Sequence, residues 1–293
     1  MFWEFISSVI LIIGLYKVFS LHIGERWAKT FSLTFIYILP LLFLLQFKWL
    51  IYYPYDTLAM AFIVLGVFFM LEEKWFYLSC ILLIATLNRE SSILIAMIFS
   101  VVYIDRLSIK KFVTIMSTLF LIYFIIRWGI HLRTIDNPAP YKGAMAFIFE
   151  NNWRVNNNIK WLFNAENILI LLSTFGWLPL FYFKLKPYIP EHMKRFHITA
   201  YIYFAVLLFI GNLYEPRIFG EIIIVLYMPL ALALYSYLQN TAIPAPGKIL
   251  LHGKNSIPPS LISYGEKFII LVINLLIILV IFMLNNLGTQ YFY

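Results

Sequence analysis

Long apolar runs recur along this chain and constrain its fold more than any other feature. The segments "FISSVILIIGLYKVFS" (5–20) and "IIIVLYMPLALALYSYL" (222–238) are almost free of charge. A helix needs about 20 apolar residues to cross a bilayer. Only 12% of the 293 residues are charged, against about 25% in a typical soluble domain. A spanning segment must satisfy its own backbone hydrogen bonds, which a helix does. The sequence therefore predicts an all-α, polytopic integral membrane protein.

We expect a single transmembrane domain over 1–293 with about ten hydrophobic helical segments plus interfacial helices. The segments are 3–21, 31–51, 56–71, 75–87, 91–104, 111–131, 166–184, 197–213, 217–238 and 267–285. The first lacks a basic region and a cleavage site, which favours a retained helix over a signal peptide. Residues 132–165 mix apolar and polar side chains and are expected to form one or two helices in the outer interface. Residues 240–266, rich in Pro, Gly and Ser, are expected to form a cytoplasmic connector.

The distribution of charge orients this map. With the N-terminus outside, the inner loops hold 14 of the 22 basic residues and 6 of the 14 acidic ones, so the inner side carries +8 and the outer side 0. Basic residues accumulate in cytoplasmic loops, so the charge is a topology signal rather than a nucleic-acid patch. The asymmetry also favours two crossings over one broken helix for 75–87 and 91–104.

Several classes of function have no support in the sequence. Cys80 is the only cysteine, which excludes an internal disulfide or a cysteine metal cluster. The five histidines are scattered without ligand spacing, and no GxGxxG, GxxxxGK[ST] or HExxH motif is present. We assign no metal ligand and no certain cofactor, and the participation of a divalent cation stays open. The partners that we expect are membrane lipid and a lipid-linked substrate, not nucleic acid.

The run "IATLNRESSIL" (84–94) places three strongly polar residues, Asn88, Arg89 and Glu90, inside an apolar stretch. An ionisable side chain at a helix centre costs about 2.5–3.5 kcal/mol, so such residues usually face water, a cavity or a partner. One interpretation is a turn outside the bilayer, with Asn88 as a helix cap and Glu90 in the next helix's first turn. The other is a polar pocket in which Arg89 binds an anion and Glu90 orients it or handles a proton.

The run "YYPYD" (52–56) is a second polar insertion on the same face. Pro54 prevents a helix from running through it. Asp56 either caps the following helix or supplies a second carboxylate to the pocket. Tyr53 either belongs to an interfacial aromatic belt or lines the same pocket.

The run "YEPRIFGE" (214–221) is the third insertion. Arg217 and Glu221 are spaced i, i+4 and share a helix face, so a structural ion pair is one interpretation. Glu221 lies about one turn into an apolar segment, where an unpaired charge is costly. All three insertions carry an acid and two carry an arginine, which favours a shared polar site over three separate ones.

The segment "YILPLLFLLQFKWLIYYPYDTLAMAFIVLGVFFMLEEKWFYLSCILLIATLNRESSILIAMIFSVVY" (37–103) resembles the core of GT-C-type polytopic glycosyltransferases. In those proteins a helix ends near a proline and an aromatic-rich outer turn, and a small-residue helix and a short cytoplasmic turn follow. The next helix ends in "glatltK"-like residues, where this chain has "LSCILLIATLNRESSILI". The pattern covers roughly 35–104 and consists of hydropathy and turns rather than a sharp motif.

The resemblance implies transfer of a sugar from a polyprenyl-phosphate donor on the outer side of the membrane. It also implies inverting chemistry, a carboxylate base, and basic residues that hold the lipid phosphate. The family's main catalytic acid lies in a first outer loop after a helix that starts in the cytoplasm, whereas here only Glu4 precedes the helix that would match the second. Three readings stay open: the first helix and loop are missing, other carboxylates act, or the protein is not a working transferase.

Candidate residues follow from these patterns. A base must lie within hydrogen-bond reach of the acceptor hydroxyl, and arginine forks suit a phosphate. The catalytic candidates are Asp56 and Glu90, and the candidate ligands of substrate or lipid phosphate are Asn88, Arg89, Arg217, Glu221, Glu215, Tyr53, Arg154 and Lys160. Two alternatives stay open beside the transferase: a transporter or flippase for a lipid-linked glycan or anion, and a non-catalytic membrane assembly partner.

Overall fold

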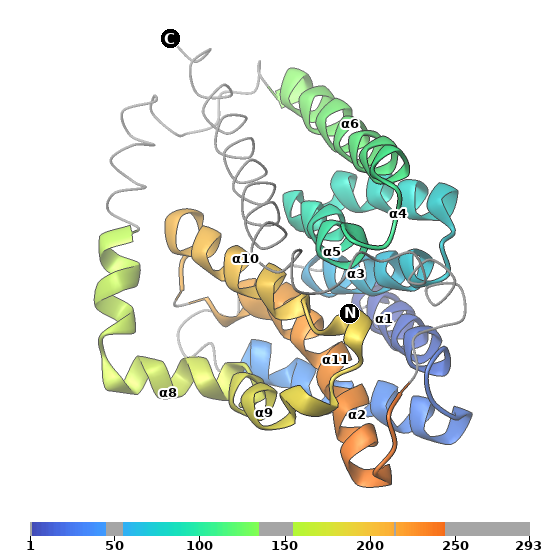
Figure 1. Ribbon diagram of the computed structural model, residues 1–293. Coiled ribbons are helices and arrows are strands. Elements are labelled where there is room, and N and C mark those ends of the chain that lie inside the picture. Colours follow the sequence, from blue (N-terminus) through green and yellow to red (C-terminus); the bar gives the residue numbers. More distant parts are fainter. Residues whose placement is uncertain (1, 45–54, 135–154, 214, 244–293) are drawn as a thin grey trace.

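A computed structural model of the chain describes residues 2–44, 55–134, 155–213 and 215–243. Every regular element in these ranges is a helix, and none of the described residues forms a strand. The expected all-α fold is therefore confirmed (Figure 1). The expected helix over 267–285 and most of segments 132–165 and 240–266 lie outside the described residues.

The helices follow the expected order of segments. They are α1 (Phe2–Ser20), α2 (Glu25–Leu44), α3 (Tyr55–Leu71), α4 (Trp75–Asn88), α5 (Ile93–Tyr103), α6 (Ile109–Thr134), α8 (Ala165–Thr174), α9 (Leu178–Leu185), α10 (Phe196–Ile210) and α11 (Gly220–Gln239), with a further helical segment over 155–162. Short 3-10 turns are η1 (Glu90–Ser92), η2 (Lys186–Tyr188), η3 (Glu191–Met193) and η4 (Pro216–Phe219). The second helix begins several residues before the predicted 31–51.

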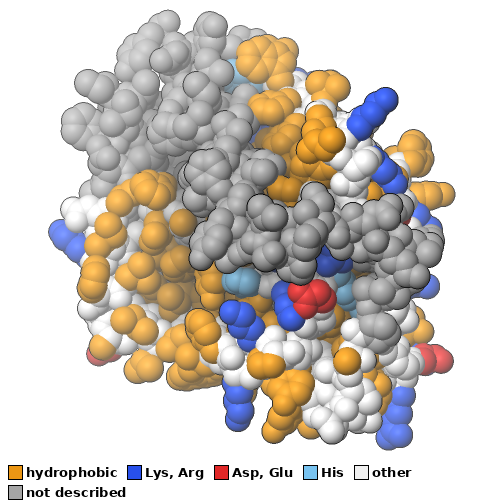
Figure 2. Space-filling view, in the orientation of Figure 1, with side chains coloured by type: hydrophobic (Ala, Val, Ile, Leu, Met, Phe, Trp, Pro, Cys, Tyr) orange, Lys and Arg blue, Asp and Glu red, His pale blue; other side chains and the backbone are white. Residues whose placement is uncertain are grey.

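Three described helices are long and apolar enough to cross a membrane: Phe2–Ser20, Ile109–Arg133 and Arg217–Gln239. The bent pair α8 and α9 makes a fourth if it counts as one span. Helices α3 and α4 and the segment Glu90–Tyr103 are apolar but shorter. Apolar side chains cover large parts of the described surface in Figure 2, and lysine and arginine side chains lie at its rim and around an acidic side chain in the lower part of the view. The chain therefore has the composition of a membrane protein, while ten spans remain a prediction.

Helices α5 and α11 form the centre of the bundle. Every side chain from Ile93 to Tyr103 is buried, as expected for a helix that is apolar on all sides. Helix α11 is buried over most of its length and packs against α3, α9 and α10 (Figure 1). The first turn of α11, residues 220–223, is buried inside the bundle.

Small residues let the central helices approach closely. A Cβ built on Gly66 of α3 would lie 3.1 Å from atoms of Ile95, and one on Gly14 of α1 would lie 3.0 Å from Val64. Such contacts between helices are typical of membrane bundles, in which close backbone approach takes the place of a hydrophobic driving force.

The two sets of loops distinguished by charge gather at opposite ends of the bundle. At one end, Arg195 pairs with Asp105 at 3.0 Å, and Lys111 lies 5.5 Å from the ring centre of Trp75. At the other end lie the described residues of the three polar insertions: 55–56, 88–90 and 215–221. The grouping of the loops agrees with the sequence map, and which end faces the cytoplasm remains a prediction.

The expected single helix over 166–184 is wrong, because the chain breaks into α8 and α9 with a bend of 69°. Gly176 and Trp177 both adopt left-handed backbone conformations, with φ of 56° and 61°. Two consecutive left-handed residues cannot continue a right-handed helix. The sequence "STFGWLPL" offers one glycine at this point, and its hydropathy alone shows no break.

Candidate functional site: a charge cluster at one end of the bundle

The turn between α4 and α5 sets the direction of the first arginine. Arg89 is extended (φ −160°, ψ 149°), and its N–H donates to the Ala85 carbonyl and closes α4. The buried hydroxyls of Thr86 and Ser92 lie 3.0 Å apart and hold the two sides of the turn together. Asn88 donates to the Tyr55 carbonyl at 3.1 Å and ties this turn to the start of α3. Asn88 therefore braces α3 instead of capping the next helix.

Asp56 lies between two arginines from distant parts of the chain. Its Oδ1 accepts from Nη1 of Arg89 at 2.5 Å, and its Oδ2 accepts from Nη1 of Arg217 at 3.3 Å. The Asp56 side chain is only 3% exposed, and those of Arg89 and Arg217 are 17% and 12% exposed. No described backbone N–H donates to this carboxylate, so Asp56 is a bridge between guanidinium groups rather than a helix cap.

Glu221 reaches Arg89 from the first turn of α11. Its Oε1 lies 3.2 Å from Nη1 of Arg89 and accepts from the Ser91 hydroxyl at 2.8 Å. The side chain is 1% exposed, and its Oε2 has no hydrogen-bond partner among the described residues. The Tyr203 hydroxyl on α10 interacts with the Ser91 side chain. The i, i+4 ion pair between Arg217 and Glu221 was one interpretation of the sequence. The described ion pairs of these two residues are instead with Asp56, Glu215 and Arg89.

Glu215 completes the group on the other side of Arg217. Its Oε2 accepts from Nη2 of Arg217 at 2.5 Å, and its Oε1 accepts from the Asn212 amide at 2.9 Å. Asn158 fixes the preceding turn, because its amide donates to the carbonyls of Leu208 and Gly211 and its oxygen accepts from the Leu213 N–H. The segment before η4 is therefore held from two sides.

Five charged side chains thus converge from α3, the α4–η1 junction, η4 and α11. We call Asp56, Arg89, Glu215, Arg217 and Glu221 the charge cluster. Three carboxylates face two guanidinium groups, so these described residues sum to −1 when all are ionised. All five were candidates from the sequence, and the structure brings them together.

Glu90 turns away from the charge cluster. Its carboxylate is 57% exposed and lies 3.5 Å from Arg127 of α6, and its backbone carbonyl accepts from the Tyr123 hydroxyl at 3.3 Å. Because the backbone of Arg89 is extended, the side chains of Arg89 and Glu90 point in different directions: Arg89 pairs with Asp56, and Glu90 pairs with Arg127. Glu90 does lie in the first turn of η1, as expected, but it lies apart from Asp56.

The remaining candidates do not join the cluster. Lys160 is exposed on the helical segment 155–162, and in the described part of the chain it forms no hydrogen bond or ion pair with the cluster. Tyr53 and Arg154 lie outside the described residues. No group of three or more His, Cys, Asp and Glu side chains in the described ranges could hold a metal ion.

Sequence reasoning missed Ser91, Tyr203, Asn212 and Asn158. Ser91 directly follows "NRE", so the sequence placed it near Arg89. The sequence did not show that its hydroxyl would donate to Glu221. Asn158 is the buried member of three consecutive asparagines. Only the phase of the helix decides which of the three points inward, and a polar run without apolar periodicity does not reveal that phase.

No protein-family model, curated protein or solved structure matches this chain. The glycosyltransferase resemblance is a sequence pattern, and the activity that it implies is a proposal.

The half-buried His22 meets the buried His192 at the opposite end of the bundle, outside the spanning segments. Nε2 of His22 lies 2.8 Å from Nε2 of His192, with ring planes within 8°, and Nδ1 of His22 lies 2.9 Å from the Val18 carbonyl. Since His22 donates through Nδ1, its Nε2 accepts from His192 when both rings are neutral. Burial lowers the pKa of His22 to about 4 and lowers the pKa of His192 well below its usual range.

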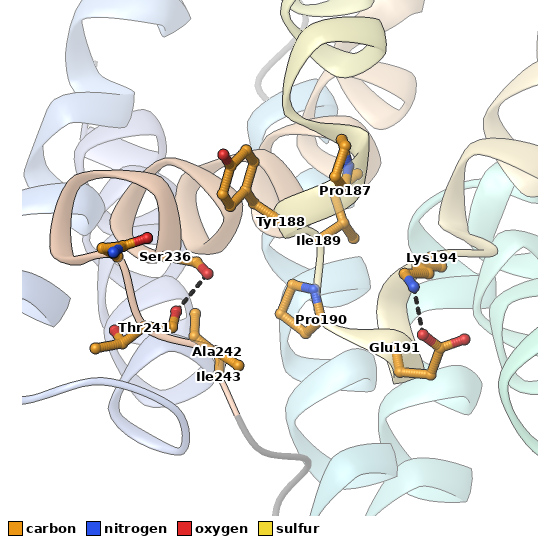
Figure 3. Close-up of a pocket in the computed structure, with 11 residues that line it drawn as sticks. Pro187, Tyr188, Ile189, Pro190, Glu191, Lys194, Ser236, Thr241, Ala242 and Ile243 are labelled. Carbon is orange, nitrogen blue, oxygen red and sulfur yellow. Dashed lines mark hydrogen bonds and ion pairs between the residues drawn. The ribbon is translucent and has the colours of Figure 1, made fainter.

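A cavity of about 400 Å³ also lies at this end, between residues 187–194 and the C-terminal end of α11 (Figure 3). Two pairs of its polar groups already contact each other: Lys194 pairs with Glu191, and the Ser236 hydroxyl donates to the Thr241 carbonyl. Ser236 lies 15 residues after Glu221, or about 22 Å along the helix, so the cavity is separate from the charge cluster.

Proposed function

We propose that this protein is a membrane glycosyltransferase. It moves a sugar from a polyprenyl-phosphate donor to a cell-envelope glycan, lipid or protein acceptor on the extracytoplasmic side. About ten membrane segments, with the charge cluster at the outer end, are part of this proposal. The observation that carries it is the bridge of Asp56 between Arg89 and Arg217, which joins three insertions in an apolar chain.

The arginines supply the phosphate site. Arg89 contacts both of its carboxylates through Nη1, and its Nε and Nη2 have no hydrogen-bond partner among the described residues. A guanidinium binds phosphate through two parallel N–H donors, so this edge is suited to a phosphate oxygen pair. The Tyr55 ring, 6.0 Å from the Arg89 guanidinium carbon, keeps the fork oriented.

Asp56 is the candidate base. The acceptor hydroxyl attacks the anomeric carbon of the sugar, and the bond from that carbon to the phosphate oxygen breaks. The bonding electrons leave with the polyprenyl phosphate, and the hydroxyl proton passes to the Asp56 carboxylate. A phosphate at the Nε and Nη2 edge of Arg89 shares the positive charge of that guanidinium with Asp56, which contacts Nη1. Binding of the lipid-linked sugar therefore weakens the attraction between Arg89 and the Asp56 carboxylate, which must accept a proton. Fixed guanidinium groups stabilise the charge that develops on the leaving phosphate.

Binding of a polyprenyl monophosphate to the protein in lipid nanodiscs tests the site. We expect Arg89→Gln and Arg217→Gln each to weaken binding about tenfold or more, because a hydrogen bond to a charged group contributes about 1.5–3 kcal/mol. The uncharged polyprenol of equal length should bind the wild type and both variants alike.

Arg195→Gln is the matched control, because Arg195 is also a partly buried arginine paired with an aspartate, at the other end of the bundle. It should leave the affinity for the polyprenyl monophosphate unchanged. The proposal is wrong if both cluster variants bind the phosphate as tightly as the wild type does while remaining folded.

The bend between α8 and α9 favours a transporter as the second candidate, because broken helices line substrate paths in many transporters. A flux assay in liposomes separates the two functions. Movement of a lipid-linked saccharide between leaflets without cleavage of its sugar–phosphate bond would favour transport, and cleavage in the presence of an acceptor would favour transfer.

A further inference from the structure

The charge cluster carries more negative than positive charge, although its proposed ligand is an anion. Asp56, Glu215 and Glu221 face Arg89 and Arg217, and the described cluster sums to −1. A phosphodiester brings one more negative charge into a site from which water is largely excluded. Like charges at such distances repel strongly in a medium of low dielectric constant. One carboxylate must therefore lose its charge when the ligand binds.

Glu221 is the carboxylate whose charge is least compensated. Asp56 has two arginines, and Glu215 has Arg217, the Asn212 amide and partial exposure to solvent. Glu221 has one arginine at 3.2 Å and the Ser91 hydroxyl, both on Oε1, while the buried Oε2 has no hydrogen-bond partner among the described residues.

Among the described residues, the groups that face Glu221 from the surrounding elements include no second cation paired with it. Asp56 comes from α3, Arg89 and Ser91 from the α4–η1 junction, and Tyr203 from α10. Arg217 lies on η4 and is shared between Asp56 and Glu215, and the exposed Glu90 is compensated by Arg127 of α6. When phosphate oxygens also bind Arg89, the one cation that pairs with Glu221 in the described part of the chain is shared with the ligand.

We propose that Glu221 takes up one proton when a phosphodiester binds at Arg89 and Arg217. This inference rests on the proposed lipid-phosphate site and adds a coupling that the site does not require. A proton on Glu221 restores the charge balance that the ligand disturbs. It also turns a carboxylate oxygen without a partner into a hydrogen-bond donor.

The probe is the methyl ester of polyprenyl phosphate, a phosphodiester whose own charge is constant across neutral pH. Titration calorimetry of the nanodisc-embedded protein in two buffers with different ionisation enthalpies counts the protons taken up. We expect about one proton per ligand at roughly pH 7, with affinity falling up to about tenfold per pH unit as pH rises. In Glu221→Gln we expect binding without proton uptake and with little dependence on pH.

Glu191→Gln, at an exposed carboxylate paired with Lys194, is the control and should retain the uptake. Binding of the phosphodiester without proton uptake overturns the inference and leaves the phosphate site standing. Proton uptake that persists in Glu221→Gln also overturns it, because the proton then goes to another group. Failure of the wild type to bind the probe at any pH overturns both the inference and the proposed site.

Discussion

At the residue scale, single polar side chains link segments that are far apart in the sequence. Asp56 joins the α4–η1 junction to η4, and Asn158 fixes the turn before η4 through three hydrogen bonds. Removing one partner of a buried ion pair costs about 3–5 kcal/mol because a charge is left uncompensated. The cluster therefore contributes to the fold as well as to the proposed chemistry, and tests of function need folded variants.

The pair of His22 and His192 makes stability depend on pH. Burial lowers both pKa values, that of His22 to about 4, so the folded state keeps neutral rings where the unfolded chain binds protons. We expect stability to fall as pH drops from about 6.5 to about 4, by up to about 1.4 kcal/mol per pH unit for each ring. Thermal unfolding in detergent at several pH values measures this slope.

The double variant His22→Gln/His192→Gln removes both titrations and keeps groups that can hydrogen-bond. Its stability should fall less steeply with decreasing pH than that of the wild type. Equal slopes for the two proteins would show that the histidine pair does not set the dependence. His131→Gln, in the last turn of α6, is the control and should keep the pH dependence of the wild type.

At the element scale, hydropathy predicted the helices well and their interruptions poorly. Segments 3–21, 56–71, 75–87 and 111–131 correspond to α1, α3, α4 and α6 within a few residues. The break in 166–184 was missed, because one glycine in an apolar run does not reveal that both Gly176 and Trp177 adopt left-handed conformations. The early start of α2 was missed because "ERWAKT" is polar and continues the helix beyond the apolar core.

Two glycines differ in the space around them, and we expect their substitution by alanine to have opposite effects on stability. Gly66 of α3 packs closely on α5, and Gly129 lies on α6. In Gly66→Ala the new methyl group meets three atoms of the buried Ile95 at 3.1 Å, so we expect a loss of about 1–3 kcal/mol. In Gly129→Ala of α6 no atom of the described residues lies within 4 Å of the new methyl group. Higher helix propensity should then make this variant as stable as the wild type or up to about 1 kcal/mol more stable. Thermal unfolding in detergent compares them, and equal stability of the two variants would contradict the packing.

At the scale of the whole molecule, the sequence predicted which polar insertions share an end of the bundle, but not how their side chains pair. The charge asymmetry and the alternation of segments brought "YYPYD", "NRE" and "YEPRIFGE" to one face. The pairing of Glu221 with Arg89, and of Glu90 with Arg127, depends on the rotation of each helix and on one extended residue. Hydropathy carries no information on either.

The central claim is that the end of the bundle with the charge cluster binds a lipid phosphate. Photocrosslinking with a polyprenyl phosphate that carries a diazirine next to the phosphate, followed by peptide mass spectrometry, tests it most directly. We predict labelled residues within 55–60, 88–92 and 215–221, with labelling lost on competition by unmodified polyprenyl phosphate and in Arg89→Gln. Specific labelling confined to the other end, within 187–194 or 236–243, would contradict the claim.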